Sequence, residues 1–383
     1  MKCKELFKKI DELYPKYIDI WKGICEIESP SEYKAGVDAV GEYVISIADK
    51  LGFSHEIHYE SVSGNAVMIT MNSEIDEQPI VLSAHMDTVH PVGSFGENPV
   101  RIEGGRLYGP GAQDCKSGIV EALLVMHALR DVGFNRRPVI LLLQSDEEVG
   151  SRTSEKRTVE FMAKKSKNAI AFLNLEGSSD GYVIIERKGI INYKLKVRGV
   201  AAHSAKCATE GASAIREAAH KIVEIEKIKD SDGITCNTGV IVGGSVPNTV
   251  AEECEFTVNV RFKNSKELLW IENKISEIAA RVYVEGCTTE ISKLSFRVPM
   301  EYNENNMALV DKINVIFREN ELSEVLPGKA FGGSDAADMT SYGIPTVDSL
   351  GPQGGKIHSK DEYATLETLR EFSKRVGAIV YCI

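Results

Sequence analysis

Apolar residues recur with the period of a helix at the beginning of the chain. They mark one face of residues 3–28 and again of 33–51, and Gly52 is suited to ending the second helix. Three short apolar runs follow, each long enough for a buried strand and too short for a helix. These runs cover residues 54–60, 65–71 and 79–85. The pattern therefore predicts two helices that lead into a sheet.

Helical and strand-like segments then alternate. Residues 91–109 are rich in glycine and proline and predict a loop or a short hairpin, and a helical segment follows at 115–133. Apolar strands at 138–144 and 169–175 enclose a helix at 154–167. Strand–helix–strand alternation is typical of a layered α/β domain, so we expect a mixed, mostly parallel sheet flanked by helices.

The pattern changes between residues 189 and 297, where the predicted order is β-α-β-β-α-β, the ferredoxin-like arrangement. The expected strands are 190–197, 234–242, 250–262 and 287–296, and the expected helices are 211–228 and 265–284. After residue 298 the α/β pattern resumes and ends in a helix at 364–381. We therefore expect a discontinuous α/β domain, 1–188 and 298–383, with an inserted α+β domain, 189–297.

Composition argues against several classes of protein. A formal net charge of −11 over 383 residues argues against nucleic acid or an anionic membrane as a partner. No stretch approaches the roughly 20 apolar residues of a membrane span. The first residues lack the apolar core of a signal peptide, which favours the cytoplasm. Eight cysteines without a C-x-x-C pair favour free thiols.

Residues with metal-binding chemistry follow three of the apolar strands. His85 ends one run, Glu147 and Glu148 follow another, and Glu176 follows a third. Open α/β sheets place their sites at the carboxyl ends of strands. Adjacent acids repel one another unless cations gather near them. Taken singly, these residues also fit a core histidine and an acidic surface loop.

Asp87 and Asp114 add two further carboxylates. The spacing of His85 and Asp87 puts both side chains on one face of a strand. Asp87 could then hold one ring nitrogen of His85 while the other nitrogen binds a metal. Asp114 lies where the N-cap of the helix at 115–133 belongs. It therefore fits either a plain helix cap or a metal ligand.

Eight motifs, in register along nearly the whole chain, carry a resemblance to a known family. They are HMDTVH, YGPGAQDCKSG, SDEEVGS, LEG, RGVAAHSA, PNTV with VNVR, GGSDA and GGKIHSKDEY. Together they resemble the dizinc peptidase and deacylase family of glutamate carboxypeptidase (carboxypeptidase G type), succinyl-diaminopimelate desuccinylase and aminoacylase. The EEVGS and GGSDA segments are most similar to the glutamate carboxypeptidase branch.

The resemblance implies two Zn²⁺ per chain, for which Co²⁺ or Mn²⁺ can substitute. The implied ligands are His85, Asp114, Glu148, Glu176 and His358. Asp114 would bridge the two ions, and the family has a cis peptide bond after this aspartate. Three carboxylates and two neutral imidazoles leave one positive charge on two zinc ions, which a bound hydroxide would neutralise.

The resemblance also implies the roles of the remaining residues. A metal-bound hydroxide would attack the amide carbonyl, with Glu147 as the general base and Asp87 supporting His85. His203 would stabilise the oxyanion, in the family from the partner subunit. Asn248 and Arg261 would grip the substrate carboxylate, which matches the forked guanidinium of arginine.

We therefore expect a cytoplasmic dizinc hydrolase that cleaves an amide or peptide bond next to a free carboxylate, as a carboxypeptidase or an N-acyl-amino-acid deacylase. Its partners would be a small peptide or N-acyl amino acid and a second copy of the chain. The inserted domain would serve as a lid and dimerise, because its edge strands need pairing or protection. Two alternatives stay open, an aminopeptidase-like di- or tripeptidase and a non-catalytic metal-binding protein of the same fold.

Overall fold

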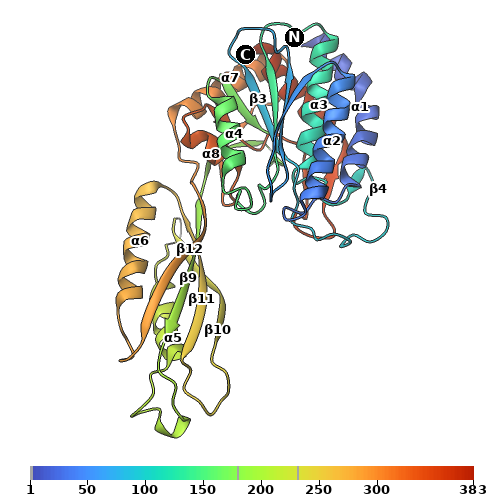
Figure 1. Ribbon diagram of the computed structural model, residues 1–383. Helices are drawn as coiled ribbons and strands as arrows, with labels where there is room; N and C mark the ends of the chain where they lie inside the picture. The colour runs from blue at the N-terminus through green and yellow to red at the C-terminus, as the bar shows by residue number, and fades with distance from the viewer. Residues whose placement is uncertain (1–2, 179–180, 231–232) are drawn as a thin grey trace. The chain divides into compact units, whose positions relative to one another are not determined.

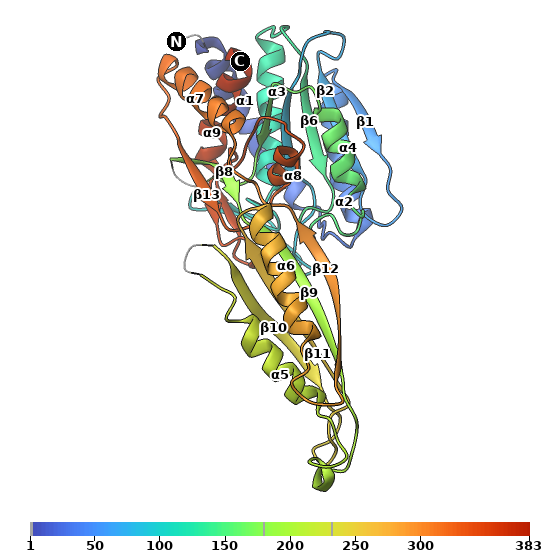
Figure 2. The same ribbon diagram turned by 90° about the vertical axis from the view of Figure 1, so that its left-hand side faces the viewer.

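The computed structural model describes residues 3–178, 181–230 and 233–383. The chain divides into two compact units. The first consists of Met1–Glu186, Tyr302–Ala330 and Ser334–Ile383, and the second of Arg187–Glu301 and Phe331–Gly333. Figures 1 and 2 show the helices and strands of each unit. Within the described ranges, no helix is both long and apolar enough to cross a membrane.

The first unit is built on a six-stranded mixed sheet with the spatial order β1-β2-β6-β3-β7-β14. The strands are β1 (Ser54–His58), β2 (Ala66–Met71), β3 (Ile80–His85), β6 (Val139–Gln144), β7 (Ala171–Asn174) and β14 (Thr346–Val347). The last four in the spatial order run parallel, and β1 and β2 are joined by antiparallel pairing. The predicted α/β class with a mixed, mostly parallel sheet is confirmed.

Helices cover both faces of this sheet (Figure 1). One layer holds α1 (Lys4–Cys25), α2 (Lys34–Lys50), α3 (Lys116–Asp131), α7 (Glu304–Glu319) and α9 (Leu366–Cys382), and the other holds α4 (Arg157–Ser166) and α8 (Asp335–Ser341). Successive strand residues point to opposite faces. Accordingly, Leu82 and Leu141 join the first core, and Val81 and Ile140 join the second. Burial on both faces explains the continuous apolar runs in the sequence.

The carboxyl ends of three neighbouring parallel strands meet at one edge of the sheet. β3 lies between β6 and β7 and is parallel to both. His85 is the last residue of β3, Glu147 and Glu148 follow β6, and Glu176 follows β7. The topology therefore brings these side chains to the same edge from distant parts of the sequence.

Two small sheets complete the first unit. One pairs β8 (Tyr182–Arg187) with β13 (Leu326–Ala330). The other has the order β15-β16-β5-β4 and contains Gly354–Gly355, Tyr363–Thr365, Arg106–Tyr108 and Arg101–Glu103. β4 and β5 form the hairpin expected within the loop at 91–109. Pairing of β16 with β5 ties the segment after His358 to the segment before Asp114.

The second unit is a four-stranded antiparallel sheet with two helices (Figure 2). Its elements are β9 (Gly189–Arg198), α5 (Ala214–Ile225), β10 (Thr235–Gly243), β11 (Glu253–Phe262), α6 (Ser265–Ala280) and β12 (Thr288–Arg297). The chain order β-α-β-β-α-β and the spatial order β10-β11-β9-β12 are ferredoxin-like. Alternate residues of β9 and β11 are buried, as the period-two pattern of the sequence predicts.

A buried ion pair stabilises the helical layer of the second unit. Lys221 and Glu217 of α5 are both buried, with 2.9 Å between Nζ and Oε1. Lys221 also donates hydrogen bonds to the carbonyls of Ile278 and Ala279, at the end of α6. The last carbonyls of a helix have no partner within the helix. The lysine therefore caps α6 while the glutamate balances its charge.

Burial of His127 couples the stability of the first unit to pH. Burial lowers the pKa of this histidine to about 4, against about 6.5 for an exposed one. His127 binds a proton more tightly in the unfolded chain than in the folded one. Neutral His127 therefore makes its full contribution to the free energy of unfolding above about pH 6.5, and this contribution is lost as the pH falls toward 4. We expect the free energy of unfolding, measured with urea, to fall less steeply across this window in His127→Gln than in the wild type.

Candidate active site and metal centre

Five of the predicted side chains converge at the carboxyl edge of the main sheet. The carboxylate of Asp114 lies between two imidazoles, with Oδ1 3.0 Å from His85 Nε2 and Oδ2 3.2 Å from His358 Nε2. Glu176 Oε1 lies 3.5 Å from His85 Nε2. Glu148 Oε2 lies 3.3 Å from His358 Nε2. The five residues thus form two groups that share Asp114, one with His85 and Glu176 and one with His358 and Glu148.

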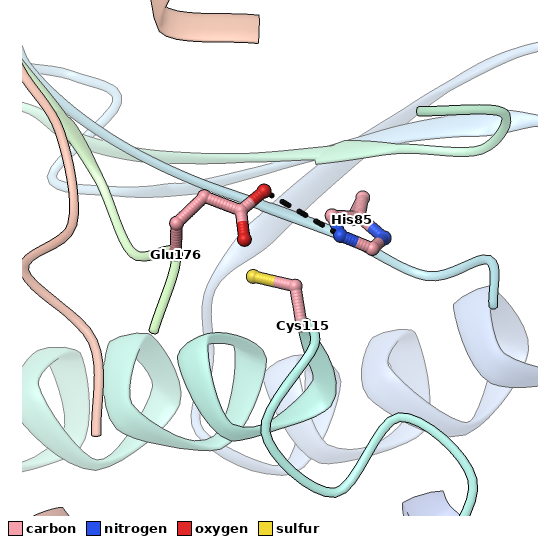
Figure 3. A group of neighbouring side chains, drawn as sticks. All are labelled: His85, Cys115 and Glu176. Atoms are coloured by element: carbon pink, nitrogen blue, oxygen red, sulfur yellow. Dashed lines mark ion pairs between the residues drawn. The ribbon is translucent and has the colours of Figure 1, made fainter. Parts of the chain in front are cut away.

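Cys115 is a neighbour of this cluster that the sequence analysis did not select. Figure 3 shows its thiol beside His85 and Glu176, and the possible ligand atoms of the three residues all lie within 4.8 Å of one another. The thiol donates a hydrogen bond to the carbonyl of Leu175, at 3.3 Å. Burial raises the pKa of Cys115 well above its usual value. The thiol is therefore held protonated against the backbone.

The backbone at Asp114 differs in one respect from the expectation of a helix cap. Helix α3 begins at Lys116, and its N-cap is Cys115, without a capping hydrogen bond from a side chain. Asp114 lies one position before the cap. Its side chain faces His85 and His358 and does not cap the helix. The peptide bond between Asp114 and Cys115 is cis, as the family resemblance implied.

Asp87 supports the cluster through hydrogen bonds to its loops and a contact with His85. Its carboxylate accepts hydrogen bonds from Ser31 Oγ at 2.6 Å, from the backbone of Glu147 at 3.0 Å and from the backbone of Glu148 at 3.1 Å. His85 Nδ1 lies 3.3 Å from this carboxylate and 2.9 Å from the Asp87 carbonyl oxygen. Because β3 ends at His85, this contact comes from the loop rather than from a shared strand face. Asp87 thereby fixes the His85 ring and the peptide that carries both glutamates.

Replacing Asp87 by alanine is expected to weaken zinc binding by about 10–100-fold, as is usual when the partner of a ligand is removed. The variant leaves two backbone N–H groups and the Ser31 hydroxyl without their acceptor. Competition with a chromophoric chelator measures the affinity. Ser31→Ala is the matched control, because it removes one donor and keeps the carboxylate, so it should have a much smaller effect. Wild-type affinity in Asp87→Ala would refute this supporting role.

The pKa shifts in the cluster indicate that its carboxylates need positive charge nearby to stay ionised. Burial raises the pKa of Glu176 well above its usual value and raises that of Glu148 to about 7. Hydrogen bonds to Asp114 and Glu148 raise the pKa of His358 to about 10. The carboxyl group of Asp114 has a lowered pKa because the hydrogen bonds from His358 and His85 outweigh its burial. Divalent cations would supply this positive charge, and mixed imidazole and carboxylate donors suit Zn²⁺, Co²⁺ or Mn²⁺.

Glu147 is buried next to the cluster, in the loop after β6 that also carries Glu148. Its backbone N–H donates to Asp87. Its negative charge contributes to the raised pKa of both Glu148 and Glu176. A carboxylate in this position can accept a proton from a group bound at the cluster.

The other predicted residues lie in the second unit. Thr249 forms an isolated β-bridge with His203, and the carbonyl of Asn248 accepts a hydrogen bond from Ser204 N at 2.9 Å. The structure therefore brings His203 and Asn248 together, and both are exposed. The ring of His203 accepts a hydrogen bond from the backbone of Ala205.

Arg261 lies at the opposite end of the same sheet. It is paired with Ile190 at the beginning of β9, whereas His203 follows Arg198 at the end of that strand. Its guanidinium donates to the carbonyl of Phe331. At about 3.3 Å per residue, the length of β9 separates the two ends by roughly 25–30 Å. Within one chain, Arg261 is therefore remote from His203 and Asn248.

Sequence reasoning missed Ser31, His90 and Glu362, which contact the cluster through its supporting loops. Glu362 is buried and accepts a hydrogen bond from the backbone of Asp114 at 3.1 Å. His90 Nε2 lies 2.7 Å from the same carboxylate. A signal for Glu362 was present, since it belongs to the GGKIHSKDEY motif. His90 likewise ends the HMDTVH motif, whereas Ser31 carries no local pattern that could have selected it.

A model of the peptidase family M20/M25/M40 matches residues 81–381. The chain belongs to this peptidase family. Carboxypeptidase G2 of Pseudomonas sp. (strain RS-16) is 25% identical over 372 residues, which cover 95% of this chain and 88% of that protein. Acetylornithine deacetylase of Myxococcus xanthus is 30% identical over 338 residues, 84% of each chain. The family resemblance inferred from the motifs is thereby confirmed, and the M20 chain is a metal-dependent peptidase or amidohydrolase.

Solved structures share the fold of this M20 chain. A tripeptidase from Staphylococcus aureus superposes with a TM-score of 0.77 at 22% identity, over 96% of this chain and 98% of the other. The M20 metallo-carboxypeptidase Sso-CP2 from Sulfolobus solfataricus superposes with a TM-score of 0.73 at 16% identity, over 95% and 98%. At such identities the likeness concerns the architecture, and the substrate has to be argued from the site.

Proposed function

We propose that this M20 chain is a dizinc hydrolase that cleaves an amide or peptide bond next to a free carboxylate, as a carboxypeptidase or an N-acyl-amino-acid deacylase. The observation that carries the proposal is the convergence of three carboxylates and two imidazoles around Asp114, with Glu147 beside them. The sequence likeness to carboxypeptidase G2 over nearly the whole chain supports the substrate class.

In this proposal His85, Asp114 and Glu176 hold one ion, and Asp114, Glu148 and His358 hold the other. Two divalent ions supply a polarised substrate carbonyl and a water molecule of lowered pKa. Glu147 accepts the proton of the attacking water at its carboxylate and delivers it to the leaving nitrogen. Asp87 keeps the His85 ring in the orientation and tautomer that leave Nε2 toward the cluster.

Substrate recognition is assigned to the second unit on the family resemblance. His203 would stabilise the oxyanion, and Asn248 and Arg261 would bind the carboxylate. One small substrate cannot reach both ends of β9. This separation supports a homodimer in which one subunit supplies His203 and Asn248 and the other supplies Arg261. β10 is an edge strand with exposed Val240, Ile241 and Val242, and it offers a surface for the pairing.

Mixing two inactive variants tests the shared site. Each His203→Ala subunit keeps its own Glu147, and each Glu147→Ala subunit keeps its own His203. If His203 acts across the dimer, subunit exchange produces one complete site per mixed dimer, and activity returns. A mixture that stays inactive after exchange would refute action across the dimer.

The substrate class is tested with a panel of N-acyl amino acids, peptides ending in glutamate, and di- and tripeptides with a free amine. Each is offered to zinc-loaded protein with a free carboxylate and as its C-terminal amide. Turnover confined to substrates with a free carboxylate, whether or not the amine is blocked, is the expected result. Turnover confined to free-amine tripeptides would select a tripeptidase instead. Zinc binding without turnover of any substrate would favour the non-catalytic alternative.

A further inference from the structure

One buried carboxylate connects the loops that carry three of the proposed ligands. Glu362 is 1% exposed. Its side chain accepts hydrogen bonds from the backbone of Gln113 at 3.0 Å, of Asp114 at 3.1 Å and of Gly111 at 3.4 Å. His90 Nε2 completes the set at 2.7 Å. Three backbone N–H donors and one imidazole nitrogen, from two separate loops, therefore point at one side chain.

Each of these loops begins or ends at a proposed metal ligand. His90 follows β3, whose last residue is His85. Gly111, Gln113 and Asp114 form the turn before α3. Glu362 itself follows His358 and is fixed by β16, which pairs with β5, and its own carbonyl accepts a hydrogen bond from Gly109. A shift of the Glu362 carboxylate would move all three loops.

The geometry of the contact suits a carboxylate better than an amide. A carboxylate offers about four lone-pair sites and no donor, whereas an amide offers one oxygen and two N–H donors. With three backbone N–H groups facing it, the single oxygen of a glutamine would leave at least one of them unsatisfied, and its own NH₂ group would face that donor. A buried donor without a partner costs about 1–3 kcal/mol. The backbone of the Gly111–Asp114 turn is therefore expected to relax when Glu362 is replaced by glutamine.

We propose that Glu362, oriented by His90, is a positioning residue for the bridging carboxylate of Asp114. It holds the Asp114 backbone at the point where Oδ1 and Oδ2 face His85 and His358, and so sets the spacing of the two metal positions. This inference rests on the proposed dizinc function. Among the described residues, Glu362 forms no hydrogen bond or ion pair with the other four proposed ligands, so it acts through Asp114.

The test measures binding of zinc alone, by competition with a chromophoric chelator, in the full-length protein. In Glu362→Gln, the zinc dissociation constant is expected to rise by about 10–100-fold. His90→Phe keeps an aromatic ring against Phe95 and loses the donor to Glu362, so it should change the constant in the same direction by a smaller factor. With zinc in excess, kcat should stay reduced and KM nearly constant in Glu362→Gln, since the substrate is not contacted.

A control at another buried carboxylate of the first unit distinguishes an effect on the metal ligands from a general loss of stability. Glu60 is buried, and it pairs with Arg157 at 2.7 Å. Glu60→Gln should lower the melting temperature and leave zinc affinity unchanged. If Glu362→Gln and His90→Phe both bind zinc with wild-type affinity, the inference is wrong. If the wild-type protein itself binds no zinc, the proposed function fails instead, so the two failures are distinguishable.

Discussion

Replacing Glu147 by glutamine is expected to lower kcat by about 10³-fold, within the 10²–10⁴-fold usual for a general acid or base. Glutamine keeps the size of the side chain and the backbone N–H that donates to Asp87. It loses the ability to accept a proton. Bound metal, measured by elemental analysis, should stay at the wild-type level, because all five proposed ligands are unchanged.

The exposed Glu155 on the loop after β6 gives a matched control for this change. Glu155→Gln removes a carboxylate from the same stretch of chain and should leave both turnover and metal content unaltered. Full activity in Glu147→Gln would exclude Glu147 as the base. Loss of metal together with activity would place Glu147 among the ligands.

Replacing Asp114 by asparagine is expected to abolish turnover and to weaken binding at both metal positions. The two oxygens of Asp114 face different histidines, so one substitution affects both groups of ligands. Asparagine has one neutral oxygen and one amide nitrogen, which cannot bridge two cations. We expect zinc affinity to fall by more than about 100-fold, beyond the 10–100-fold typical of residues that only support a ligand.

Asp361 supplies the comparison for this variant. It belongs to the loop that carries His358, but its side chain is exposed and pairs with Lys356 at 3.2 Å. Asp361→Asn should bind zinc as the wild type does. An Asp114→Asn protein that retained one tightly bound zinc ion would show that the two positions are independent, which would contradict the bridging role.

The architecture was predictable where burial leaves a periodic signal. The apolar runs at 79–85 and 138–144 predict strands because both of their faces are covered by helices. The alternation in β9 and β11 predicts strands with one covered face. β13 has no such signal, since Pro327 and Gly328 interrupt its short run and its partner β8 is distant in the sequence.

The convergence of the ligands followed from the rule that parallel strands present their carboxyl ends at one edge, together with the motifs. The supporting contacts did not follow. Ser31 and His90 reach the site through single hydrogen bonds to residues far away in the chain. A contact of this kind depends on tertiary packing and leaves no spacing in the sequence. The local sequence also made Asp114 resemble a helix cap, because its contacts with His85 and His358 arise only in the folded chain.

The burial of most cysteines allows selective chemical labelling of the exposed Cys207. Cys207 is exposed, Cys382 is half-buried, and the other six cysteines are buried. Burial raises the pKa of Cys25 and of Cys236 to about 12, which keeps these thiols unreactive toward alkylating reagents. A maleimide dye in brief contact with the native protein should therefore label Cys207 first. The natural chain thus carries its own attachment point for a fluorophore, four residues from His203.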